Sequence, residues 1–266
     1  MTGVPTQFLY SAIMVEANFV GLDGTAHNRK GTGFLVSRSG AHYLVTNRHV
    51  LDASWDKPNQ NTNGSRYRNF ALQNIYCQGR ASGDALREFR ISEPPTFSDT
   101  YNEDVAVVKF TIAYTRDGRG NLQVSNYFSF DDLVEDTGFG TEILACDQVA
   151  FPCYGEGHSE SDTRPIFRMG WIISDPTADL DYEHVKGRVF LVEGFSTNGA
   201  SGAPVLALPV GIQIGPMLTM TGGRGHRPLR IAGVNAGHLL SPDFRHAHVS
   251  YAFKASIIRE LITKAG

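Results

Sequence analysis

The chain has 266 residues, a net charge of −3 and 41% hydrophobic residues, as expected for a globular protein that could hold two small domains. This charge gives no reason to expect a nucleic-acid or membrane partner, and no stretch approaches the roughly 18 consecutive apolar residues of a membrane span. Residues 1–7 lack the basic and apolar runs of a secretory signal, and three cysteines are too few for a disulfide framework. We therefore expect a cytoplasmic protein with reduced thiols.

Short apolar runs separated by Gly, Pro, Asn and Asp predict many short strands. The predicted strands cover residues 12–15, 33–36, 43–46, 71–76, 105–110, 142–145, 148–151, 166–173, 189–192, 204–208 and 230–234. Residues 52–69 are predicted to form a loop, 115–126 a connection between two halves, and 211–228 a hairpin. Apolar residues at helical spacing from 253 to 262 predict a C-terminal helix. A series of short strands of this kind is typical of a sandwich or barrel.

Three local sequences carry residues that can do chemistry together. A glycine-flanked strand is predicted to lead through a turn to a second strand that ends on His49. Asp104 stands just before a β-branched run, and Ser201 lies in a turn of small residues that opens into a strand. A serine hydroxyl needs a base to become a nucleophile, and a histidine oriented by a carboxylate is such a base. The order His, Asp, Ser, each in a suitable local context, predicts a catalytic triad. The N–H groups of Gly199 and Ser201 are the predicted oxyanion donors.

The same sequences resemble those of trypsin-like serine peptidases, and of the HtrA (Do-like) branch in particular. The matching segments are TNRHV at 46–50, NEDVAV at 102–107 and GASGAP at 199–204, with weaker matches at 147–155 and 231–235. The resemblance covers roughly residues 10–262. It implies an all-β fold of two six-stranded antiparallel barrels with a C-terminal helix, the first over 10–115 and the second over 116–266. It also implies hydrolysis of protein or peptide substrates without a cofactor or metal.

Two positions depart from the pattern that this family shows. Ala203 replaces the usual second glycine after the serine, and Ala200 stands where secreted trypsins carry an aspartate that receives the freed amino terminus. We also expect no PDZ domain after the helix, unlike the typical HtrA architecture. Regulation by a partner protein in trans is one expectation that follows, and a catalytically silent protein that binds peptides is the alternative to an active peptidase.

The resemblance also implies which residues bind the substrate. Phe195 occupies the base of the primary specificity pocket, which favours an apolar residue before the scissile bond. The remaining substrate-binding residues implied are Asn198, Gly233, Val234, Asn235 and His238. His238 keeps selection of Gln or Glu open as the alternative.

Other residues receive simpler interpretations. The pair His246 and His248 is predicted to lie on the surface, Cys146 and Cys153 in buried strands. Phe167, Met169 and Trp171 alternate and are predicted to pack the second barrel, whereas Trp55 is predicted either to cover the core or to contact a lid. A basic cluster of Arg66, Arg68 and Arg80 is too modest to predict nucleic-acid binding against the negative net charge.

Overall fold

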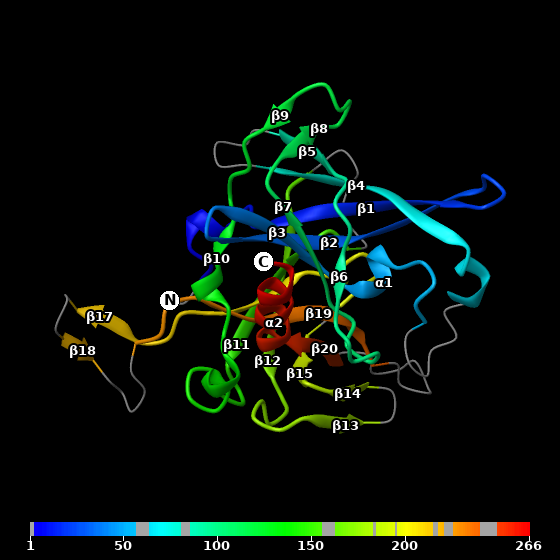
Figure 1. The fold of residues 1–266 in the computed structure, drawn as a ribbon. Coiled ribbons are helices and arrows are strands. Elements are labelled where there is room, and N and C mark those ends of the chain that lie inside the picture. Colours follow the sequence, from blue (N-terminus) through cyan, green and yellow to red (C-terminus); the bar gives the residue numbers. More distant parts are fainter. Residues whose placement is uncertain are drawn as a thin grey trace.

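The computed structural model describes residues 3–56, 64–80, 86–155, 163–182, 185–194, 196–214, 218–220, 226–239 and 249–266. Within these ranges the chain is mainly β and ends in one long helix, as the sequence predicts (Figure 1). No helix in the described ranges is long and apolar enough to cross a membrane. Strand pairing gives two large sheets and two small hairpins.

The first sheet has ten strands. They are β1 (Ala12–Gly21), β2 (Ala26–Arg38), β3 (Ala41–Thr46), β4 (Phe70–Arg80), β5 (Leu86–Ile91), β6 (Thr96–Phe97), β7 (Ala106–Phe110), β8 (Ala113–Thr115), β9 (Asn121–Leu122) and β10 (Phe128–Ser129). The order along the sheet is β6-β7-β3-β2-β1-β4-β5-β8-β9, and β10 pairs with β2 in parallel. Strand β9 lies inside the predicted connection 115–126, which is therefore partly sheet.

Alternation along these strands explains why they surround one core. In β1 the residues Ile13, Val15, Ala17 and Phe19 are buried, and those between them are more exposed. Strands β1–β5 and β7 all contribute side chains to this core. The six strands thus share one apolar interior, although the strand pairs in the described residues form an open path rather than a closed ring.

The second sheet is a closed barrel with the order β11-β12-β15-β20-β19-β16. Its strands are β11 (Gln148–Cys153), β12 (Ile166–Ile172), β15 (Val189–Glu193), β16 (Pro204–Ala207), β19 (Arg230–His238) and β20 (Val249–Lys254). The small hairpins are β13 (Leu180–Tyr182) with β14 (Val185–Gly187), and β17 (Ile212–Ile214) with β18 (Leu218–Met220). The second hairpin falls in the predicted hairpin region and projects from the body (Figure 1).

Helices are short except at the C-terminus. The α-helices are α1 (Arg48–Leu51) and α2 (Ala255–Ala265), and the 3-10 helices are η1 (Thr6–Phe8), η2 (Gly64–Tyr67), η3 (Phe130–Asp132) and η4 (Asp136–Gly138). Helix α2 begins later than predicted because residues up to Lys254 pair in β20. It buries Ile257, Ile258 and Ile262 in a core shared by the barrel and the outer face of β2, β3 and β7. The two sheets are therefore joined by apolar packing.

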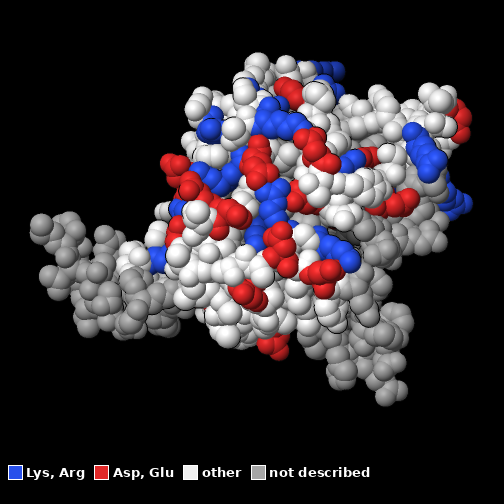
Figure 2. All heavy atoms as spheres, turned by 60° about the horizontal axis from the view of Figure 1, so that its bottom comes forward, with Lys and Arg blue, Asp and Glu red and all other residues white. Residues whose placement is uncertain are grey.

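Charged side chains are mixed on the surface. On the face seen in Figure 2, Lys and Arg are interspersed with Asp and Glu and form no extended patch of one sign. Many of them pair, as Arg259 does with Glu135 and Lys264 with Asp99.

Several predictions about single elements are wrong. Residues 142–145 form a turn in which only Ile143 makes an isolated bridge. Met169 and Trp171 are 43% and 49% exposed because they point outward from β12, where Gly170 and Ile172 point inward. Cys146 is exposed in a turn at positive φ, whereas Cys153 is buried as predicted.

Trp55, for which two roles stayed open, packs beside Tyr101, with the two ring centroids 5.9 Å apart. It is 2% exposed, and its indole N–H donates to the Tyr101 carbonyl at 3.1 Å.

Candidate active site

His49 lies on α1, immediately after β3. The strand ends at Thr46, Asn47 is extended, and the chain then makes the single helical turn that carries His49. This differs slightly from the sequence prediction, which placed the histidine at the strand end. Asn47 is fully buried and donates a hydrogen bond to the Asp104 carbonyl at 2.6 Å. This contact ties the residues before His49 to the residue predicted to orient it.

Asp104 reaches His49 because their strands are neighbours. It precedes β7, which pairs with β3 so that Thr46 lies opposite Ala106. Asp104 Oδ2 lies 2.6 Å from His49 Nδ1, and Oδ1 accepts from the His49 backbone N–H at 2.9 Å. Asp104 is 2% exposed, so both contacts are shielded from water. Because an ionised carboxylate only accepts, Nδ1 donates its proton and leaves Nε2 as the acceptor.

Arg29 on β2 holds α1 from the other side. Its guanidinium donates to the carbonyls of His49 at 2.5 Å, Asp52 at 3.3 Å and Ala53 at 2.8 Å. Burial lowers the pKa of Arg29, and the carboxylate of Asp52 opposes that change. The cation binds carbonyls at the end of the helical turn, where helices lack internal donors, and so fixes the backbone of His49.

Ser201 lies in a tight turn before β16. Gly199 and Gly202 flank it with φ of +85° and +90°, which side-chain-bearing residues rarely adopt. The turn is closed by Ala203 N–H, which donates to the Ala200 carbonyl at 3.1 Å, and by Gly202 N–H, which donates to the Asn235 carbonyl at 2.8 Å. Ser201 itself is partly exposed. Ala203 is fully buried, so its methyl group fits where the family pattern has a glycine.

The predicted oxyanion donors are the backbone N–H groups of Gly199 and Ser201. Within the described residues, neither Gly199 N–H nor Ser201 N–H has a hydrogen-bond acceptor. The peptide between them is anchored, because Ala200 N–H donates to the Thr197 carbonyl at 3.0 Å. An oxyanion site requires unpaired donors on a restrained turn of this kind.

The serine turn packs directly against the first sheet. Thr32 N–H on β2 donates to the Ser201 carbonyl at 2.8 Å. A Cβ placed on Gly31 would lie 3.0 Å from the Ser201 carbonyl oxygen and 2.9 Å from Cγ2 of Val50, the residue after His49. A glycine is therefore required at position 31, between the serine turn and α1. The helical turn that carries His49 and the turn that carries Ser201 meet at this residue.

The predicted substrate-binding residues have different surroundings. Val234 is fully buried in the core, and the Asn235 side chain donates to Ser196 Oγ at 3.0 Å and to the Ala200 carbonyl at 2.9 Å. The Val234 side chain is therefore used in core packing, and the Asn235 side chain in hydrogen bonds to Ser196 and to the serine turn. Asn198 is exposed and His238 partly exposed.

Two further positions remain from that set. Gly233 closely approaches β20, since a Cβ there would lie 2.1 Å from the Phe253 carbonyl oxygen. Phe195 lies outside the described residues, so the base of the pocket stays a prediction.

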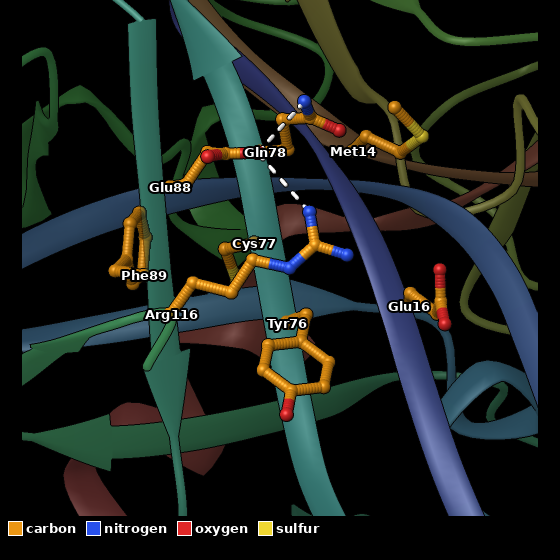
Figure 3. A pocket seen from close by; sticks show the side chains of 8 residues that line it. All are labelled: Met14, Glu16, Tyr76, Cys77, Gln78, Glu88, Phe89 and Arg116. Atoms are coloured by element: carbon orange, nitrogen blue, oxygen red, sulfur yellow. Dashed lines mark hydrogen bonds and ion pairs between the residues drawn. The ribbon is translucent and has the colours of Figure 1, made fainter. Parts of the chain in front are cut away.

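A hollow on the outer face of the first sheet lies apart from these residues. Figure 3 shows Arg116 reaching over the sheet toward Glu88, with Gln78 donating to the same carboxylate. Its cavity volume is about 30 Å³, and none of its lining residues belongs to the predicted site.

The described residues contain no group of three His, Cys, Asp or Glu side chains that could hold a metal ion. His246 and His248 lie outside the described residues.

The motifs gave no supporting role to four residues: Thr32, Arg29, and the pair in which Arg188 donates to Glu103 at 2.9 and 3.1 Å. Thr32 had a signal, since it is a hydroxyl residue between two glycines in an otherwise apolar segment. The contacts of the others join distant parts of the chain and left no pattern in the sequence.

Comparison with known proteins supports the fold only. No protein-family model and no curated protein matches the chain. Among solved structures, the apo MamO protease domain from Magnetospirillum magneticum is 14% identical, with a TM-score of 0.52 over 96% of this chain and 97% of that chain. Protease Anisep from Arthrobacter nicotinovorans is 13% identical, with a TM-score of 0.52 over 97% and 96%.

The active form of the Rv3671c protease from M. tuberculosis is 15% identical, with a TM-score of 0.50 over 97% of this chain and 82% of that chain. At such identities the likeness concerns the path of the backbone.

Proposed function

We propose that this chain, which has the fold of trypsin-like serine proteases, is a serine endopeptidase with His49, Asp104 and Ser201 as its catalytic triad. The observation that carries the proposal is the shielded contact of 2.6 Å between His49 Nδ1 and Asp104 Oδ2. This contact makes Nε2 the basic nitrogen and lies at the junction where the Ser201 turn is held.

The reaction follows from the roles of these groups. His49 Nε2 accepts the Ser201 hydroxyl proton while Ser201 Oγ bonds to the substrate carbonyl carbon. The oxygen of that carbonyl becomes an oxyanion, which the N–H groups of Gly199 and Ser201 stabilise. His49 then gives the proton to the leaving amine as the peptide bond breaks. Water repeats the sequence on the acyl-enzyme and regenerates Ser201.

The substrate is proposed to be a protein or peptide with an apolar residue before the scissile bond. This preference rests on the resemblance that places Phe195 at the pocket base. Profiling the purified protein on a peptide library tests it, and cleavage only after Gln or Glu would replace it with the alternative selectivity.

A biotinylated fluorophosphonate tests the triad most directly, because it phosphonylates only an activated serine. We expect labelling of the wild-type protein and none of Ser201→Ala, with hydrolysis falling by at least about 10³-fold in that variant. Near-ultraviolet circular dichroism of both proteins is the control for folding. Equal labelling of the two proteins contradicts the assignment of Ser201. A folded wild-type protein without labelling or hydrolysis would favour the silent peptide-binding alternative.

A further inference from the structure

The hydroxyl of Thr32 connects the two sheets at the serine turn. Thr32 lies on β2, is fully buried, and donates from Oγ1 to the Gly199 carbonyl at 2.7 Å. The same oxygen accepts from Tyr154 N–H, next to β11, at 3.0 Å. Since it accepts from an N–H, its own proton is directed to Gly199. One side chain of the first sheet therefore links two segments of the second.

These contacts restrain the peptide between the two proposed oxyanion donors. That peptide joins Gly199 to Ala200; its carbonyl binds Thr32 Oγ1 and its N–H binds the Thr197 carbonyl. The carbonyl of Ser201, two residues further on, accepts from Thr32 N–H at 2.8 Å. Gly199 has the greatest backbone freedom of any residue type, so a peptide beside it needs such restraints to stay in one orientation.

No charged group is present in the turn to supply this restraint. Ala200 is fully buried and has no side-chain polar atom. The backbone of Thr32 is held within its own sheet, because the Thr32 carbonyl accepts from Thr46 Oγ1 at 2.7 Å. The first sheet thus holds Thr32 in place, and Thr32 restrains the serine turn of the second sheet.

We infer that Thr32 is a positioning residue that preorganises the oxyanion site through its hydroxyl. This inference rests on the proposed function. It predicts that loss of the hydroxyl weakens binding of the transition state and leaves binding of the substrate intact, because only the transition state carries the oxyanion.

The experiment compares Thr32→Val, which removes the hydroxyl at nearly constant volume, with Thr32→Ser, which retains it. A peptide nitroanilide with an apolar residue before the bond serves as substrate, and the trifluoromethyl ketone of the same peptide as the transition-state analogue. We expect Thr32→Val to lower kcat by about 10-fold to 100-fold with KM within about twofold. Affinity for the ketone should fall by the same factor, and Thr32→Ser should stay within about threefold of wild type.

Ser11→Ala is the control for lost stability. It removes a buried hydroxyl hydrogen bond, from Ser11 Oγ to the Phe8 carbonyl at 2.8 Å, that involves no residue of the serine turn. An equal fall in kcat for Ser11→Ala, or a Thr32→Val kcat within about twofold of wild type, would overturn the inference. Should Thr32→Val not fold, Thr32→Cys replaces it with the same criteria, since a thiol is a weak donor.

If the protein is not a serine endopeptidase, the outcome differs from all of those expected for the Thr32 variants. In that case the wild-type protein itself neither reacts with the fluorophosphonate nor hydrolyses the substrate.

Discussion

The two halves of the candidate site are built in different ways. His49 and Asp104 belong to one sheet, where the pairing of β3 with β7 places them side by side. Ser201 and Gly199 belong to the barrel, but Thr32 of the first sheet accounts for two of the hydrogen bonds that restrain them. The acid–base pair thus depends on one strand ladder, whereas the nucleophile turn depends on the docking of two sheets.

The two halves should therefore respond differently to substitutions. A change within the acid–base pair should impair the chemistry and leave the fold intact. A change at the junction between the sheets should impair both the chemistry and the stability. Substitutions can therefore be chosen to break one half without the other.

Asp104→Asn should have the largest effect on activity in this comparison. The amide offers an N–H where the carboxylate accepts, which favours the wrong histidine tautomer, so we expect kcat to fall by about 10⁴-fold. Thermal unfolding should change little, because the side chain keeps its volume. A kcat within about tenfold of wild type at neutral pH would show that Asp104 does not orient His49.

Gly202→Ala should break the second half. A Cβ on Gly202 would lie 1.9 Å from the Thr32 carbonyl oxygen and 2.3 Å from Thr46 Oγ1, and the residue has a φ of +90°. Displacing the turn by about 1 Å costs on the order of 100-fold in kcat, and the strain lowers the free energy of unfolding by more than about 1 kcal/mol. Steady-state kinetics and chemical denaturation measure the two effects.

Gly40→Ala is the matched control for backbone strain. Gly40 has a φ of +80°, and a Cβ placed on it would meet nothing within 4 Å. It should lose stability without losing kcat. Similar kinetic losses in both variants would mean that the contact with Thr32 is unimportant.

The sequence predicted the parts of the site that are local. The residue types and order of His49, Asp104 and Ser201 are visible in short segments, and so are the strands that precede or follow them. The support from Thr32 joins residues 167 positions apart and that from Arg188 residues 85 apart, so neither follows from local pattern. Trp171 was misassigned because alternation shows which residues share a face but not which face is buried.

Arg188→Met should have a smaller effect, chiefly on stability. Arg188 precedes β15 and donates to Glu103, beside Asp104, at 2.9 and 3.1 Å, and also to Glu260 on α2. Burial alone would lower the pKa of Arg188, but hydrogen bonds with Glu260 and Glu103 raise it overall. The Glu103 side chain is 4% exposed. Because the substitution leaves that buried carboxylate with the Ser98 hydroxyl but without its cation, we expect a loss of about 3 kcal/mol in the free energy of unfolding.

Lys264→Met is the control for the loss of an ion pair as such. Its partner Asp99 is 91% exposed, and pairs of this kind contribute little. Denaturant titrations of both variants make the comparison. An equally small change for Arg188→Met would show that the pair with Glu103 does not stabilise the fold.

The distribution of the three cysteines has a practical consequence for chemical labelling. Cys77 and Cys153 are buried, and burial raises the pKa of both thiols, which keeps them protonated and poorly nucleophilic. Cys146 is exposed in the turn before β11. A maleimide dye would therefore attach at one defined position of the unaltered chain, which allows fluorescence and surface-immobilisation studies without removing any thiol by mutation.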